Sequence, residues 1–119
     1  MTYVDGFVVP VPRKKLAAFR SMAKKVGKVW MEHGALSYVE CVADDVKVGK
    51  RTSFPRSVKL KSGETVVFAW ITYKSRASRD RIVDKVTKDK RSAAIMSHDA
   101  MPFDGKRMIF GGFKAFLEL

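Results

Sequence analysis

The pattern of hydrophobic and polar positions along the chain predicts four strands and two main helices. β-branched and aromatic residues cluster in four short segments, which is typical of strands. The predicted strands cover residues 3–11, 35–46, 65–73 and 106–116. From Leu16 the apolar residues recur in steps of three and four until Gly34, which predicts one long helix with a glycine stop.

A second helix is predicted between the third and fourth strands. Ser75 or Ser78 can cap its N-terminus, and its apolar pattern continues to about Asp89. A short extra helical turn is expected at residues 93–96. Residues 47–63 contain several lysines and arginines but no acid, and glycine and proline interrupt them, so they are predicted to form an exposed, irregular or hairpin-like loop.

Two glycine-containing segments frame the last strand. The Asp104-Gly105 pair predicts a turn into it, and Gly111-Gly112 predicts a bulge or a point of close backbone approach. The resulting βαββαβ order predicts an α+β, ferredoxin-like fold, in which a four-stranded antiparallel sheet carries both helices on one face. The chain length predicts a single domain over residues 1–119.

The second face of this sheet is predicted to be apolar as well. On the third strand, one set of alternating residues is Val66, Phe68 and Trp70, and the opposite set is Val67, Ala69 and Ile71. An antiparallel sheet normally shows water a polar face, so something other than water must cover the face that the helices leave bare. A second copy of the chain, packed sheet against sheet, is the simplest candidate, and we therefore expect a homodimer.

The charge of the chain has two competing explanations. Lysine and arginine outnumber aspartate and glutamate by 24 to 12, which gives a net charge of +12. This charge attracts nucleic acid. The sequence also contains no asparagine and no glutamine, a depletion that accompanies lysine enrichment in heat-adapted proteins. Both explanations stay open at this point.

Cysteine usage and hydropathy predict a soluble, cytoplasmic protein. Cys41 is the single cysteine, so the chain can form neither an internal disulfide nor a thiolate metal cluster. No apolar run approaches the roughly 20 residues of a membrane span, so no membrane partner is expected. Nothing in the sequence indicates a cofactor.

Five segments resemble one family. They are Tyr3-Val4-Asp5-Gly6-Phe7, Glu32-His33-Gly34-Ala35-Leu36, Tyr38-Val39-Glu40-Cys41-Val42, Thr52-Ser53-Phe54-Pro55 and Met101-Pro102-Phe103-Asp104-Gly105-Lys106-Arg107-Met108. Together they are similar to the YbaA-like family of unknown function, over nearly the whole chain. The resemblance implies a dimeric α+β barrel built from two ferredoxin-like sheets. It implies no established activity.

Two carboxylates are candidate catalytic residues. Asp5 and Glu40 each interrupt an apolar strand, where a carboxylate is costly unless it is paired, hydrogen-bonded or useful. If both face one cavity, they can form an acid/base pair with shifted pKa values. The alternative is a structural ion pair with Lys106 or Arg107 at the dimer interface.

Three further side chains are candidates for chemistry. His33 lies on the apolar stripe of the first helix, as either a general base in a pocket or a structural histidine. His98 lies beside Asp99 and has no metal-ligand spacing to His33, so no metal site is expected. Trp70 matches the tryptophan on the third strand of dimeric α+β barrel monooxygenases, by fold analogy only, and core or interface packing is the alternative.

RNA binding is the second hypothesis, because RNA-recognition domains share the βαββαβ order and stack bases on sheet aromatics. The corresponding aromatics are Phe7, Phe68 and Trp70. The basic residues expected to follow the phosphates are Lys47, Lys50, Arg51, Arg56, Lys59 and Lys61. The third strand lacks the glycine and the leading basic residue of the RNA-recognition signature, so the match is partial.

The sequence therefore ranks three functions. The first is a cytosolic homodimer that binds a small ligand in a pocket between sheet and helices, with or without enzymatic activity. RNA binding through the sheet is second, and a structural or interaction role is third. The identity of the ligand and of any reaction is left open.

Overall fold

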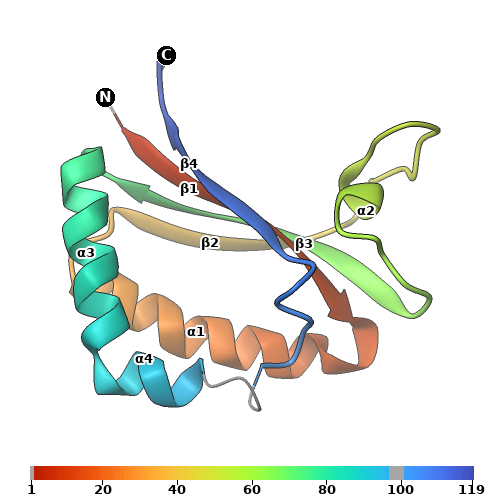
Figure 1. The fold of residues 1–119 in the computed structure, drawn as a ribbon, viewed down its shortest axis with the longest axis horizontal. Helices are drawn as coiled ribbons and strands as arrows, with labels where there is room; N and C mark the ends of the chain where they lie inside the picture. The colour runs from red at the N-terminus through yellow and green to blue at the C-terminus, as the bar shows by residue number, and fades with distance from the viewer. Residues whose placement is uncertain (1, 97–100) are drawn as a thin grey trace.

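The computed structural model describes residues 2–96 and 101–119 and contains one four-stranded antiparallel sheet (Figure 1). The strands are β1 (Tyr3–Pro12), β2 (Ser37–Val42), β3 (Glu64–Tyr73) and β4 (Ile109–Lys114). They are arranged in the order β2-β3-β1-β4. The helices are α1 (Leu16–Glu32), α2 (Phe54–Ser57), α3 (Arg76–Lys88) and α4 (Lys90–Ile95), and a 3-10 turn, η1, covers Arg13–Lys15.

The predicted βαββαβ order and ferredoxin-like fold are confirmed. β1 and β2 are joined by α1 and lie on either side of β3, which runs antiparallel to both. The second and fourth strands are shorter than predicted. The second ends at Val42, before the turn-forming Asp44 and Asp45, and the fourth begins only after the Asp104 turn.

The helix ends follow the predicted chemistry. Gly34 adopts a φ of 113° directly after α1, where a side chain would be strained. The hydroxyl of Ser75 accepts a hydrogen bond from the Ser78 amide, which fixes the start of α3. The predicted turn at residues 93–96 is part of α4, whose N-cap is Asp89.

Strand alternation divides the side chains of the sheet into two sets. Tyr3, Phe7 and Val9 face α1 and α3, and they pack in the main core with residues such as Phe19 and Ile82. In Figure 1, α1, α3 and α4 lie on this side of the sheet. We refer to this side as the helix face and to the opposite side as the open face.

The segment around α2 lies on the open face, and the sequence did not predict it. Residues 47–63 were expected to be irregular and exposed. Instead, α2 begins after the Ser53 cap, and Val58 packs against Val8 and Val66 at one end of the open face. Leu60 packs against the same cluster. The chain therefore covers part of this face itself.

The rest of the open face and the β4 edge remain apolar and exposed. Phe68 is 43% exposed, Ile109 45% and Phe113 65%. On the helix face, Phe110 is 71% exposed. No helix in the described part of the chain is long and apolar enough to cross a membrane.

Candidate functional site

A groove and a small cavity lie between α1 and the sheet. The groove has a volume of about 650 Å³ and runs between α1 and the edge strand β2. The cavity, of about 120 Å³, lies deeper, between α1 and the middle of the sheet. Phe19, Tyr38 and Glu40 line both spaces, so the groove and the cavity meet at these side chains. The predicted position of a pocket between sheet and helices agrees with this geometry.

Tyr38 and Glu40 form the polar part of this junction. The Tyr38 hydroxyl donates a hydrogen bond of 3.1 Å to Glu40 Oε1. Partial burial raises the pKa of Glu40 above its ordinary value, against the opposing effect of this hydrogen bond. Burial and the neighbouring carboxylate also raise the pKa of Tyr38. The raised pKa values favour the protonated form of both groups, and the Glu40 carboxyl keeps access to solvent.

Gly27 makes room for Tyr38 beneath α1. A Cβ atom at position 27 would lie 2.8 Å from Tyr38 Cδ1, which is closer than side chains normally approach. The Tyr38 ring also lies 6.3 Å from the ring of Trp30 in a tilted arrangement. The glycine therefore fixes how deeply the tyrosine enters the space between helix and sheet.

Methionines line much of the cavity. The chain has six methionines, and four of them contribute to this lining, namely Met22, Met96, Met101 and Met108. Methionine is unbranched and polarizable, so it adapts to apolar ligands of different shape. The lining therefore favours an apolar occupant over a strongly hydrogen-bonding one.

Asp5 lies on the helix face but does not meet Glu40. Its carboxylate accepts a hydrogen bond of 2.8 Å from the Tyr73 hydroxyl and lies 3.7 Å from Arg79 Nε. Trp30 Nε1 in turn donates to the Tyr73 hydroxyl over 2.9 Å. Burial and the hydrogen bond to Asp5 raise the pKa of Tyr73. Asp5 is thus the centre of a buried polar cluster, and the acid/base pair considered for Asp5 and Glu40 does not form.

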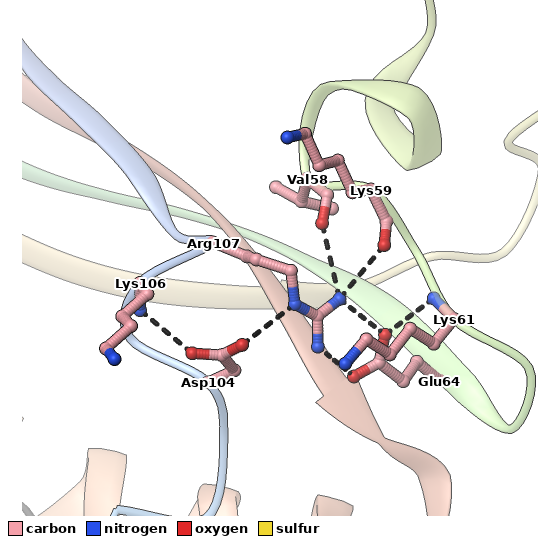
Figure 2. Close-up of polar contacts among 7 residues, drawn as sticks. All are labelled: Val58, Lys59, Lys61, Glu64, Asp104, Lys106 and Arg107. Carbon is pink, nitrogen blue, oxygen red and sulfur yellow. Dashed lines mark hydrogen bonds and ion pairs between the residues drawn. The ribbon is translucent and has the colours of Figure 1, made fainter.

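Arg107 and Lys106 do not pair with Asp5 or Glu40. Figure 2 shows Arg107 between Glu64 and Asp104, with hydrogen bonds also reaching the carbonyls of Val58 and Lys59. The Arg107 Nη2–Glu64 Oε2 distance is 2.6 Å.

In the same turn, the backbone amide of Lys106 donates a hydrogen bond of 3.0 Å to Asp104 Oδ1. The guanidinium of Arg107 lowers the pKa of Glu64 and of Asp104. Arg107 therefore joins the start of β4 to β3 and to the α2 segment.

His33 lies outside the groove and the cavity. It caps the C-terminus of α1, and its Nε2 atom lies 3.0 Å from Asp89 Oδ2. Arg91 pairs with the same carboxylate and with Glu32 on α1. Arg91 and His33 together lower the pKa of Asp89. This cluster links α1 to α4, so the structural interpretation of His33 fits its position, and His98 lies outside the described residues.

The aromatic residues of the RNA hypothesis lie on two different faces. Phe68 and Trp70 share the open face, with ring centroids 5.8 Å apart. Phe7 instead packs in the core on the helix face and stacks on Phe110 at 6.1 Å. The expectation that Phe7 joins the other two on one surface is wrong, because strand alternation places it opposite Ala69 rather than Trp70.

One of the basic residues predicted to contact RNA phosphates is hydrogen-bonded within the chain. Arg56 donates hydrogen bonds to the carbonyls of Val48 and Gly49 and so closes the loop before α2. The remaining predicted cations are exposed, namely Lys47, Lys50, Arg51, Lys59 and Lys61. No cluster of three or more metal-ligating side chains occurs within residues 2–96 and 101–119.

Tyr38 was not among the site residues predicted from the sequence. Its signal was an isolated glycine inside a strong helical pattern, because Gly27 has no role as a cap and so indicates close packing. A row of cations at Arg20, Lys24 and Lys28 was also missed, although the spacing of four places them on one helix face.

Comparison with known proteins identifies the family. The family model described as Protein of unknown function (DUF1428) matches residues 2–105. Uncharacterized protein YbaA of Escherichia coli (strain K12) is 48% identical over 118 residues, which cover 99% of both chains. The protein of the same description from Shigella flexneri matches equally well.

Solved structures share the fold at low sequence identity. Rv0793 from Mycobacterium tuberculosis is 12% identical, with a TM-score of 0.60 over 99% of this chain and 98% of its own. An uncharacterized NIPSNAP domain protein from Burkholderia xenovorans has the same identity and TM-score, covering 98% of each chain. A protein described as dimeric and ferredoxin-like, from an uncultured marine organism, is 12% identical with a TM-score of 0.54 over both whole chains. The family-model match and the 48% identity to YbaA show that the chain belongs to the DUF1428 family of proteins of unknown function.

Proposed function

We propose that this protein is a homodimer that binds a small, largely apolar molecule between α1 and the sheet. The observation that carries the proposal is the junction at Tyr38 and Glu40, where a groove of about 650 Å³ continues into an apolar cavity. A volume of several hundred Å³ with mostly apolar walls and few polar groups is typical of small-molecule sites. The methionines of the cavity suit such a ligand.

The homodimer is supported by the surface that the chain leaves uncovered. Ile109 and Phe113 of β4 and Phe68 of β3 are exposed on the open face, on either side of β1. β4 is also an edge strand, and an exposed apolar edge favours pairing with another chain. A related solved fold is described as dimeric. Packing of two open faces would remove the side chains of Phe68, Ile109 and Phe113 from water.

Two measurements test the proposal. Light scattering at several concentrations should give a concentration-independent dimer mass. Calorimetric titration with decanol, a neutral apolar probe, should give saturable binding. Met22→Trp, which fills the cavity, should abolish that binding, whereas Ser21→Trp on the exposed side of α1 should retain it. A stable monomer contradicts the dimer, and equal binding by both variants contradicts the site.

RNA binding through the open face is the competing function. The exposed ring of Phe68, the half-buried ring of Trp70 beside it and the uncovered basic loop favour it. It requires a monomer, because a sheet-to-sheet dimer buries these rings. A monomer that binds single-stranded RNA with a sequence preference at high salt would support this function, since salt screens contacts that depend on net charge alone.

A further inference from the structure

The groove has a positively charged rim along α1. Arg20, Lys24 and Lys28 line it at intervals of four residues, and about 12 Å of helix separates the first from the last. All three side chains are exposed. Within the described residues, none of them makes a hydrogen bond to a side chain or an ion pair. Their charges are therefore available to a ligand in the groove.

The acids of the groove do not cancel this charge. Glu32 lies at one end, but Arg91 holds it at 2.7 Å. Glu40 lies on the β2 side, where it accepts a hydrogen bond from the Tyr38 hydroxyl. The α1 side thus carries three cations against the single unpaired carboxyl of Glu40, so an anion is attracted to the helix rim.

The floor between these two sides is apolar. Phe19 and Ala23 of α1 face Val42 of β2 and Val67 of β3 across the groove. The floor leads inward, past Tyr38, to the cavity. A ligand can therefore keep an anionic group at the rim while an apolar chain extends along the floor and into the cavity.

We infer that the ligand of this site is an amphiphile with an anionic head group and an apolar chain. The inference rests on the proposed function, because it names the class of molecule for the same groove and cavity. The head group contacts the ammonium and guanidinium groups of Lys24, Lys28 and Arg20. The chain replaces water on the apolar floor, which supplies most of the binding free energy.

The test compares decanoate with decanol, which share the apolar chain and differ in the charge of the head group. Both are titrated into the intact protein by calorimetry. The rim variant Arg20→Gln/Lys24→Gln/Lys28→Gln removes one arginine and two lysines. The control variant Lys47→Gln/Lys50→Gln/Arg51→Gln removes the same residue types and the same charge from the exposed loop.

The expected result separates the head group from the chain. Decanoate should bind more tightly than decanol. The rim variant should weaken the binding of decanoate about tenfold and leave the affinity for decanol unchanged. The loop control should change neither. Glu40→Gln should have the opposite effect and make decanoate bind more tightly, because it removes the carboxyl of the groove that has no cationic partner.

Several outcomes would overturn the inference. Equal binding of the two probes, unaffected by the rim variant, would leave the apolar site intact and reject the preference for an anionic head group. Equal weakening by the rim and loop variants would show attraction to net charge alone. If decanoate fails to bind and the rim variant alters the dimerisation constant, a second copy of the chain occupies the groove. Binding of neither probe would reject the proposed function along with the inference.

Discussion

Tyr38 and Glu40 are hydrogen-bonded over 3.1 Å although both lie on an exposed edge strand, and they are the two polar side chains where groove and cavity meet. Their spacing of two residues turns both toward α1. The pKa of each is raised, because partial burial disfavours both the carboxylate and the phenolate. This pair gives the site its polar end.

The raised pKa of Glu40 predicts a specific dependence of stability on pH. A carboxyl that is easier to protonate in the folded state costs stability as pH rises through its unfolded value of 4.5 toward the folded pKa. Glu40→Gln removes this titration. The unfolding free energy of this variant should therefore rise relative to that of the natural protein as pH increases from below 4.5 toward the folded pKa of Glu40, by a modest amount because Glu40 keeps contact with solvent. Urea denaturation across that range measures the difference, and a constant difference would contradict the burial of Glu40.

The lowered pKa of Glu64 predicts the opposite dependence of stability on pH. Its pKa is lowered by Arg107, so its contribution to stability is present above the unfolded value of 4.5 and is lost as pH falls through the lower folded value. Arg107→Met leaves a buried carboxylate without its charged partner and should cost about 2 kcal/mol at neutral pH. The cost should shrink in acid. Urea denaturation at neutral and acid pH measures it, and a cost that does not depend on pH would show that packing of Arg107, not the ion pair, is what matters.

Gly27→Ala tests how tightly Tyr38 is held. Alanine favours the helix by about 1 kcal/mol over glycine. The added Cβ would lie 2.8 Å from the Tyr38 ring, and such overpacking typically costs about 1–3 kcal/mol. We expect a net loss of stability in urea denaturation, together with weaker decanol binding. A gain of stability would show that Tyr38 moves aside without cost.

Gly111 and Gly112 provide a matched pair of substitutions. A Cβ at position 112 would collide with the hydroxyl of Tyr3 and the guanidinium of Arg79, whereas one at 111 would meet only Phe113 at 3.6 Å. Gly112→Ala should therefore lower the free energy of unfolding by about 1–3 kcal/mol, and Gly111→Ala by much less. Equal effects in urea denaturation would mean that the polar cluster around Arg79 tolerates displacement.

Phe113→Asp tests the proposed interface with little cost to the single chain. The side chain is 65% exposed, so a carboxylate there stays hydrated in a monomer but would be buried between two open faces. Light scattering should show dissociation to monomers with an unchanged circular dichroism spectrum. The control Leu36→Asp, at a residue 58% exposed before β2, should remain dimeric. Dissociation of both variants, or of neither, would count against the open face as the interface.

Local sequence signals determined the order of the elements. The glycine stop at Gly34, the Ser75 cap and the alternating third strand act over a few residues, so each could be located without the fold. The prediction that both faces of the sheet are apolar followed from the same alternation, and Phe68 and Trp70 lie on the open face as expected.

The α2 segment was decided only by the tertiary structure. Val58 and Leu60 are two apolar residues within a basic segment, which is too short a pattern to mark them as buried. The burial of Val58 depends on contact with Val8 and Val66, which are distant in the sequence. Predicting it would have required knowing which strands lie beneath the loop.

The partners of the charged residues were likewise decided by the fold. Asp5 and Glu40 stand out in the sequence, because each places a carboxylate in an apolar strand. Asp5 is paired with Arg79, while Arg107 pairs with Glu64. These contacts join residues 43 or more positions apart, and spacing along the chain carries no information about them. The sequence alone thus determined the strands, the helices and which residues were anomalous, whereas tertiary packing decided which of them meet.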